Sequence, residues 1–321
     1  MSRISRRDFV IAASAAAASA AAPRGAWAAD VVRMGYIGDF NGASLLAIAT
    51  DQNLWAERGL QPDLKVFTNG PIQIQAFGSG SLDFGYIGPG ALWLPASGRA
   101  KVIAINNLGE ADRVIAQSGI RTLADLKGKR VGVPEGTSGD MLLRLAFRKQ
   151  GMSIADVELI RMDPSTVVAA FASRQIDAAG IWYPLVGVIK DRVPDLVELA
   201  KNADFFPEIA FPTAFVSRND VADDLSLKVI AVLKTANAFR AANVEKSVAI
   251  TSKFIGVPAD KLATEAANSK LLTTPELEAA AADGTAAGWL STLNAMFKEF
   301  GRLSEPLDPK AYFRADLYEA G

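Results

Sequence analysis

The chain has 321 residues, of which 50% are hydrophobic, with 34 basic and 35 acidic side chains and a formal net charge of −1. A nucleic-acid or anionic-membrane partner requires a basic surplus, which this sequence lacks. Cysteine and histidine are both absent, so the chain has no disulfide, lacks the usual metal ligands and lacks the commonest general base. With no Gly-x-Ser-x-Gly elbow either, the sequence argues against an enzyme, and we expect no cofactor and no metal.

The first 28 residues are typical of an export signal. Arg6-Arg7 precedes an alanine-rich apolar run over 11–22, and Ala26-Trp27-Ala28 places small residues where a signal peptidase reads them. The segment resembles a twin-arginine signal, and its apolar run is too short for a membrane span. We therefore expect the twin-arginine machinery as an export partner, cleavage near Ala28, and a periplasmic mature chain of net charge −4. A cytoplasmic protein with a basic N-terminus is the alternative.

The mature chain alternates strand-like apolar runs with helical patterns, which indicates α/β lobes with helices covering mostly parallel sheets. The predicted strands are 31–36, 64–67, 82–87, 102–105, 131–133, 157–162, 176–182 and 196–199, with helices over 43–58, from 71, and over 89–97. From residue 220 the pattern is almost wholly helical, over 225–254, 258–268 and 275–300. We expect these last helices to pack on the first lobe.

A weak internal repeat supports two similar lobes. Residues 76–83 and 170–177 share Ala-Phe-x-Ser-x-x-(Leu/Ile)-Asp at an offset of 94 residues, and each copy leads into an apolar strand that reaches Pro89 or Pro184. Chance similarity between α/β units is the alternative. Because open α/β sheets bind ligands at the carboxyl ends of their strands, residues 87–91 and 182–185 should face one cleft.

The stretch Val131–Gly151 predicts a short strand, a glycine-rich turn and an amphipathic helix that begins near Ser138. Thr137, Ser138 and Asp140 supply N-cap chemistry. A helix N-terminus presents unpaired N–H groups and a positive dipole, so the 136–139 turn is a candidate site for a small acidic group. No Gly-Lys-Ser/Thr follows, which argues against a phosphate loop, and an ordinary capped helix is the alternative.

Several short motifs together resemble the nitrate/sulfonate/taurine family of periplasmic solute-binding proteins. They are Gly35-Tyr36, Asn53–Leu60, Gly80–Gly85, Leu123–Val133 and Gln175–Ala179, and the resemblance covers essentially the whole mature chain. It implies the type II periplasmic-binding fold, an α/β architecture of two lobes joined by two crossover strands, with the ligand cleft between them. Lobe one is then 29–110 and 214–321, and lobe two is 111–213.

The resemblance also implies a function. It predicts a monomeric substrate-binding subunit, not an enzyme, that captures a small organic anion by lobe closure and delivers it to an ABC permease and ATPase at the inner membrane. Residues 88–92, 181–186 and 272–275 are most similar to taurine-binding proteins, which favours a sulfonate of the taurine or alkanesulfonate type. The alternatives are a nitrate-like anion, an aromatic sulfonate or carboxylate, a thiamine pyrimidine precursor, or a ligand-sensing receptor subunit.

A sulfonate spreads one charge over three oxygens and is suited to several neutral donors, because a buried cation carries a desolvation cost. The candidate donors and nearby backbone are Thr137, Ser138 and Gly139 in lobe two, and Asn41, Gly88, Pro89, Gly90 and Thr213 elsewhere. Aromatic side chains that could wall an organic substituent are Trp93, Trp182, Tyr183 and Phe211, with core packing as the alternative for each.

One departure from the taurine-binding pattern concerns a ligand amine. Those proteins have an acidic residue before the strand that leads into an Arg-x-Asp pair, whereas Arg218-Asn219-Asp220 here follows a stretch over 212–217 without an acid. The missing negative charge would have to come from elsewhere in the chain. Candidates are Asp39, Glu110, Asp112 and Glu208, each with a solvated surface role as the alternative.

Overall fold

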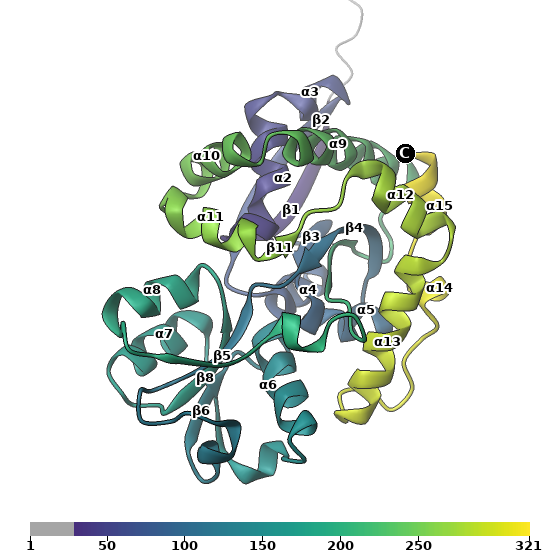
Figure 1. The fold of residues 1–321 in the computed structure, drawn as a ribbon. Coiled ribbons are helices and arrows are strands. Elements are labelled where there is room, and N and C mark those ends of the chain that lie inside the picture. The colour runs from purple at the N-terminus through teal and green to yellow at the C-terminus, as the bar shows by residue number, and fades with distance from the viewer. Residues whose placement is uncertain (1–28) are drawn as a thin grey trace, which may run out of the picture.

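The computed structural model describes residues 29–321, which form two α/β lobes, each built around its own sheet (Figure 1). We call the elements of the six-stranded sheet and the helices on it lobe one, and those of the five-stranded sheet lobe two. The predicted fold class, two α/β lobes with a cleft between them, is confirmed. The predicted export signal, residues 1–28, lies outside the described residues.

The two sheets take their strands from separate parts of the chain. Lobe one contains β1 (Asp30–Ile37), β2 (Leu60–Phe67), β3 (Phe84–Ile87), β4 (Lys101–Gly109), β10 (Pro212–Ser217) and β11 (Ser269–Lys270), in the order β11-β4-β10-β3-β1-β2. Lobe two contains β5 (Asp112–Ala116), β6 (Arg130–Val133), β7 (Glu158–Arg161), β8 (Ala178–Trp182) and β9 (Val197–Lys201), in the order β7-β6-β8-β5-β9. The chain therefore crosses between the lobes twice, from β4 to β5 and from β9 to β10.

Both sheets are mixed, so the prediction of mostly parallel sheets is wrong. β1 pairs parallel with β2 and β3, and β6 with β7 and β8. β10 is antiparallel to β3 and β4, and β5 is antiparallel to β8 and β9. The reason is the crossovers: most strands run toward the cleft after a helix, whereas β5 and β10 enter their sheets from the cleft and run away from it.

Helices cover both sheets. They are α2 (Phe40–Asp51), α3 (Leu54–Glu57), α4 (Gly70–Gly78), α5 (Trp93–Ala96), α6 (Ser138–Lys149), α7 (Pro164–Ala172), α8 (Leu185–Arg192), α9 (Asp223–Ala242), α10 (Val244–Ile255), α11 (Ala259–Ala267), α12 (Thr274–Ala282), α13 (Thr285–Glu299), α14 (Pro309–Tyr312) and α15 (Ala315–Ala320), with single 3₁₀ turns η1 (Pro89–Ala91), η2 (Leu123–Leu126), η3 (Ile154–Asp156) and η4 (Asn202–Phe205). Among residues 29–321, no helix is both long and apolar enough to span a membrane.

Three long predicted helices are each divided in two. The first breaks before Asn53, which adopts a left-handed conformation with φ of 58°, and the last breaks at Gly284, with φ of 85°. Helix 225–254 breaks at Asn243, which ends α9 and precedes α10. Asn and Gly are the residues that leave helical geometry at least cost, so these breaks follow from local chemistry.

Helix α2 lies at the centre of lobe one. Its sequence, FNGASLLAIATD, is apolar nearly all round, and such a helix is stable only when it is covered on every side. Helices α9, α10 and α11 pack against it, as predicted for the C-terminal segment, while α12–α15 extend along one side of the molecule (Figure 1). This packing fixes the N-terminus of α2 at the edge of lobe one that faces lobe two.

The sequence repeat corresponds to equivalent structures. Asp83 accepts hydrogen bonds from the Arg33 backbone N–H at 3.3 Å and from the Arg33 guanidinium at 2.7 and 2.8 Å. Asp177 likewise accepts from the Arg130 backbone N–H at 2.8 Å and from its guanidinium at 3.4 Å. In each lobe the repeat acid thus fastens the strand that follows it, β3 or β8, to the neighbouring strand.

Lobe two depends on a close approach between α6 and β8, and this generates a stability prediction. A Cβ added at Gly180 would lie 2.4 Å from the Gly139 carbonyl oxygen, whereas one added at Gly288, on the exposed side of α13, meets nothing within 4 Å. We expect Gly180→Ala to lower the free energy of unfolding by about 1–3 kcal/mol through overpacking. The matched control, Gly288→Ala, should raise it by about 0.5–1 kcal/mol. Urea unfolding measures both, and equal effects would contradict the packing argument.

Candidate functional site

A cavity of about 40 Å³ lies between the lobes. Lobe one lines it with Ile37, Asp39, Asn69, Gly70, Tyr86, Gly88, Pro89, Ala91, Thr213 and Glu265, and lobe two with Trp182, Tyr183, Ala111, Asp112, Thr137 and Ser138. The loops after β3 and β8, which follow the two copies of the repeat, therefore both face this cleft, as predicted.

The N-terminus of α2 is occupied by the chain's own carboxylates. Asp39 is the N-cap residue, and its carboxylate accepts a hydrogen bond of 2.7 Å from the Gly42 N–H. Glu265 of α11 accepts from the Phe40 N–H at 2.7 Å and from the Asn41 N–H at 2.9 Å, one bond to each oxygen. The positive end of this helix thus stabilises two buried negative groups of the protein itself.

Asp112, at the start of β5, is the third acidic residue of the cavity. Its side chain accepts a hydrogen bond of 3.0 Å from the Asn202 amide, while the Asn202 carbonyl accepts from the Asp112 N–H at 2.8 Å. The position immediately after a crossover explains its place: the chain leaves lobe one at Gly109, and Asp112 is the first residue paired in the second sheet.

Burial perturbs the protonation of all three acids. It raises the pKa of Asp39 to about 7, an effect reduced by the Gly42 N–H and reinforced by the charge of Asp112. It raises the pKa of Asp112 to about 6, against hydrogen bonds from Ser138 and Asn202 that lower it. Burial, with the charge of Asp39, raises the pKa of Glu265 well above its usual range. Carboxylates without a cation are costly to bury, and these three share that cost.

The predicted helix start at Ser138 is confirmed, while the Thr137 hydroxyl, predicted to donate to the ligand, has an acceptor within the protein. Thr137 is the N-cap of α6 without a side-chain cap, and its hydroxyl donates to the Pro134 carbonyl at 2.6 Å. The Asp140 carboxylate accepts from the Gly136 N–H at 2.9 Å instead. The Ser138 hydroxyl lines the cavity and donates to Asp112, so both hydroxyls of this turn have acceptors within the protein.

Eight of the predicted ligand-binding residues line the cavity, and four do not. Those that line it are Asp39, Gly88, Pro89, Thr137, Ser138, Trp182, Tyr183 and Thr213. Asn41 is directed elsewhere, because its side-chain oxygen accepts from Asn107 at 2.5 Å and from Ser269 at 3.1 Å. Glu208 is exposed on the loop between η4 and β10 and does not line the cavity.

The other two, Gly90 and Gly139, act through close packing. A Cβ at Gly90 would lie 2.2 Å from the backbone carbonyl of Thr137 across the cleft, and one at Gly139 would lie 2.3 Å from the Gly180 oxygen. Of the remaining aromatic candidates, Trp93 donates its indole N–H to the Gly136 carbonyl at 3.2 Å, and Phe211 is buried in the core. Neither of these aromatic residues lines the cavity.

Sequence reasoning missed two functional residues, Glu265 and Tyr86. Glu265 comes from the C-terminal helices, more than 200 residues from Asp39, and no local motif marks it. Tyr86 belongs to β3 and was read only as part of a buried strand, yet it lines the cavity. Of the proposed acids, Asp39 and Asp112 are in the cavity, whereas Glu110 contributes a backbone carbonyl to a neighbouring network.

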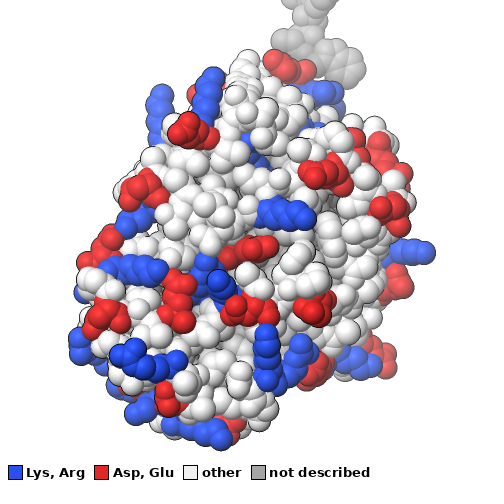
Figure 2. All heavy atoms as spheres, in the orientation of Figure 1, with Lys and Arg blue, Asp and Glu red and all other residues white. Residues whose placement is uncertain are grey.

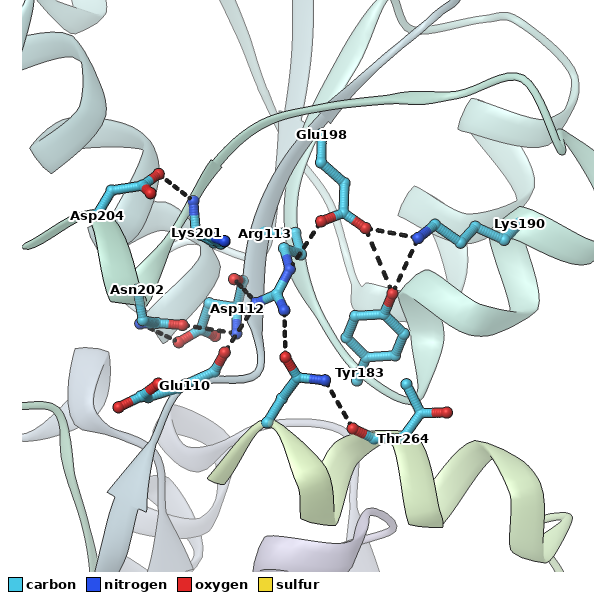
Figure 3. A network of polar contacts seen from close by, with 11 residues as sticks. Glu110, Asp112, Arg113, Tyr183, Lys190, Glu198, Lys201, Asn202, Asp204 and Thr264 are labelled. Atoms are coloured by element: carbon cyan, nitrogen blue, oxygen red, sulfur yellow. Dashed lines mark hydrogen bonds and ion pairs between the residues drawn. The ribbon is translucent and has the colours of Figure 1, made fainter. Parts of the chain in front are cut away.

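That network is organised by Arg113, which lies next to the cavity (Figure 3). Its guanidinium donates to Glu198 at 3.0 Å, to the backbone carbonyls of Glu110 and Asp112 at 2.8 and 2.7 Å, and to the Asn268 side chain at 2.5 Å. Asn268 caps the end of α11, the helix that carries Glu265. Arg113 therefore links the crossover and lobe two to the helix that closes the cavity from lobe one.

Tyr183 connects this network to the cavity wall. The Arg113 guanidinium lies 5.4 Å from the centre of the Tyr183 ring, and Lys190 donates to the Tyr183 hydroxyl at 3.1 Å and to Glu198 at 2.6 Å. Tyr183 thus lines the cavity, while its hydroxyl is held by Lys190 and Glu198 (Figure 3).

Polar contacts hold the lobes together around the cavity. Arg302, after α13, pairs with Glu135 at 3.2 Å and also with Asp140. Further pairs across the cleft are Arg148–Glu299 at 2.6 Å, Lys261–Asp191 at 2.7 Å and Thr68–Asp163 at 2.9 Å. The structure is therefore a closed arrangement of the lobes, with contacts on both sides of the cavity.

Comparison with known proteins identifies the family. Residues 42–238 match the family model described as NMT1/THI5 like. A binding protein of Brucella abortus is 60% identical over 292 residues, which covers 90% of this chain and 92% of the relative. The chain belongs to the NMT1/THI5-like family. An aliphatic sulfonates-binding protein of Escherichia coli is 26% identical over 73% of this chain and 75% of its own length. The resemblance to the nitrate/sulfonate/taurine solute-binding proteins is thereby confirmed.

Solved structures agree on the fold. The periplasmic aliphatic sulphonate binding protein SsuA from Escherichia coli superposes with a TM-score of 0.69 at 21% identity, over 90% of this chain and 99% of that one. A desulfurization enzyme, DSZB, superposes with a TM-score of 0.65 at 13% identity, over 91% of this chain and 98% of that one. Since one fold hosts both binding and catalysis, the activity has to be argued from the cavity itself.

The buried acids generate a prediction about pH and stability. An unfolded aspartate has a pKa of about 3.9, so between about pH 4 and the raised values the folded chain holds protons that the unfolded chain has lost. The stabilising effect of these protons is complete at low pH and is lost as the pH rises through about 6 for Asp112 and about 7 for Asp39. Asp39→Asn keeps the N-cap, because Asn caps as well as Asp.

We expect Asp39→Asn to raise the free energy of unfolding of the ligand-free protein at pH 8 by on the order of 2–4 kcal/mol, and to change it little at pH 4.5. Chemical denaturation of both proteins across this range measures the difference between the two profiles. Parallel profiles for the wild type and the variant would show that Asp39 titrates as an ordinary carboxylate.

Proposed function

We propose that the protein is the substrate-binding subunit of an ABC importer, which captures a small organic solute between its lobes and delivers it to a membrane permease and its ATPase. The observation that carries this proposal is a cavity that both lobes line, with the loops after the two copies of the sequence repeat on opposite sides of it. Such a site exists only when the lobes are together, so binding and closure are one event. The relatives' names, as binding proteins, support the same conclusion.

A sulfonate is the ligand group that the relatives' names favour. In this cleft its place would be the N-terminus of α6, where the Ser138 hydroxyl lines the cavity and the first-turn N–H groups carry positive dipole. The N-terminus of α2 is not open to it, because Asp39 and Glu265 already accept the N–H groups there. The sulfonate assignment therefore rests on one helix end, because the Ser138 hydroxyl already donates to Asp112.

Closure can be tested with a pair of glycine variants in one turn. A Cβ at Gly90 would lie 2.2–2.3 Å from the Thr137–Ser138 backbone of the other lobe, whereas one at Gly88 would lie 3.7 Å from the Ser138 hydroxyl, an ordinary contact. We expect Gly90→Ala to weaken binding of any cleft ligand by about 10- to 100-fold, the equivalent of overpacking by about 1–3 kcal/mol. Gly88→Ala, the control, should bind within a few-fold of the wild type.

The measurement begins with a thermal-shift screen of small solutes, followed by calorimetry and small-angle scattering on the compounds that stabilise the protein. A cleft ligand should reduce the radius of gyration of the wild type and of Gly88→Ala but not of Gly90→Ala. Ligands that bind Gly90→Ala as tightly as the wild type would refute capture between the lobes.

Export through the twin-arginine route is part of this proposal, and it is supported by the sequence of residues 1–28. We expect the double substitution Arg6→Lys with Arg7→Lys to leave the precursor in the cytoplasm, because that route reads the arginine pair. Fractionation of cells that express each form, followed by immunoblotting, compares their periplasmic yields. An equal yield from the double variant would indicate a different export route.

A further inference from the structure

We propose that the ligand carries a protonated nitrogen, which binds in the cleft at Asp39, within the negative field of Glu265 and Asp112; this inference rests on the proposed function and specifies its ligand class. The nitrogen is part of a small organic molecule, either a cation or a zwitterion whose acidic group lies at the N-terminus of α6. A ligand that is only an anion, such as nitrate or a simple alkanesulfonate, does not meet this requirement.

The charge of the cavity wall is the first argument. Asp39, Glu265 and Asp112 are 5%, 1% and 4% exposed, they come from three different elements, and all three line the same space. Among the lining residues that the structure describes there is neither a lysine nor an arginine. By contrast, basic and acidic side chains are interspersed over the face of the molecule in Figure 2. The excess of negative charge is therefore local to the cleft.

The nearest buried cations are already engaged elsewhere. Arg113 directs its guanidinium to Glu198, to two backbone carbonyls and to Asn268, on the outer side of Asp112. Arg240 is fully buried beneath the cavity, where it donates to Ser44, to the Asn106 carbonyl and to Asn237. Neither forms an ion pair with the three acids, although the charge of Arg113 lowers the pKa of Asp112; a cation inside the cleft itself would come from the ligand.

Asp39 provides the second, independent argument. It is 95% buried, yet within residues 29–321 the N–H of Gly42 is its one hydrogen-bond donor of ordinary length, with the Trp182 indole as a further neighbour. Its carboxylate has two oxygens and room for several donors. With the Gly42 N–H and the Trp182 side chain as its donors, the carboxylate retains room for a further donor, and an N–H of a charged nitrogen is the strongest such donor.

The surroundings favour an organic cation over a metal ion. Within the described chain, no three acidic side chains come close enough together to hold one metal ion. The rings of Trp182, Tyr183 and Tyr86 line the same cavity, and aromatic faces attract organic cations. Burial keeps the Tyr86 hydroxyl neutral by raising its pKa, so this residue adds no further charge.

Charge can be tested at constant shape with three planar probes. Benzamidine, benzamide and benzoate have the same ring and a similar head group, but carry a positive charge, no charge and a negative charge. Calorimetry and thermal shift of the wild type at pH 8 should show benzamidine binding at least tenfold more tightly than benzamide, and no binding of benzoate. Benzamidine stays protonated between pH 5 and 8, so any loss of its affinity as the pH falls reports protonation of the protein.

The titratable and charged groups that face the acids are Asp39, Asp112, Glu265 and Tyr86 in the cleft, with Arg113 and Arg240 behind it. Because cation binding requires ionised carboxylates, we expect benzamidine to bind at least about tenfold more weakly at pH 5 than at pH 8. The protein should release protons when benzamidine binds and take them up again when it dissociates. An affinity that rises as the pH falls is the behaviour of an anion site and would overturn the proposal.

Asp39→Asn separates charge from structure, because Asn still caps α2. We expect it to weaken benzamidine about 10- to 100-fold at pH 8, as for loss of a charge-assisted bond. The control is Asp308→Asn, which makes the same change at another helix N-cap, that of α14, whose residues do not line the cavity. This control should bind benzamidine within twofold of the wild type. If both variants bind equally, Asp39 does not hold the cation.

The two proposals fail in different ways. If benzamidine does not bind at millimolar concentration, or if benzoate or ethanesulfonate binds more tightly, the proposal of a cationic ligand is wrong. Capture between the lobes still stands in that case, provided that Gly90→Ala weakens binding of the anion. If benzamidine binds but Gly90→Ala leaves its affinity unchanged, the site is not the cleft, and both the proposed function and this inference are wrong.

Discussion

The structure depends on one electrostatic constraint: the N-terminus of a fully buried helix, α2, lies at the cleft and is capped by two carboxylates. Asp39 and Glu265 together accept three N–H groups of its first turn, which is why two acids less than a tenth exposed are tolerated there. Glu265 reaches this position because α11, one of the C-terminal helices, packs against α2. Since α2 also forms the centre of lobe one, the same helix both completes the hydrophobic core and provides the N–H groups that bind the two acids.

Lobe two brings complementary features to the same place. Its loop after β8 supplies aromatic faces, its crossover supplies Asp112, and α6 supplies a helix N-terminus with the Ser138 hydroxyl. These meet lobe one through close backbone packing at Gly90 and through ion pairs at the rim. Exposed ion pairs contribute little each, so the close fit between the lobes is what defines the shape of the closed cavity.

The sequence predicted the two lobes, most strands and the loops that face the cleft, because hydrophobic periodicity and the repeat are local signals. It predicted Asp39 and Asp112 only as members of a set of four acids, since nothing local distinguishes a buried acid from a solvated one. It missed Glu265, because the contact with α2 joins positions more than 200 residues apart. The acceptor of the Thr137 hydroxyl was missed for a related reason: whether a hydroxyl is free depends on a carbonyl three residues earlier, which a pattern does not show.

Mutual repulsion of the acids connects charge to motion. Asp39 and Glu265 stay together at the N-terminus of α2, so opening of the lobes would separate only Asp112 from them; closure removes water and brings Asp112 of lobe two toward this pair. Closure without a ligand therefore either leaves these charges unpaired or requires that they take up protons, and both oppose it near neutral pH. A bound cation removes this cost. The same groups that recognise a protonated nitrogen would thus make closure conditional on its presence, which is the property that an importer needs in order to tell loaded from empty binding subunits.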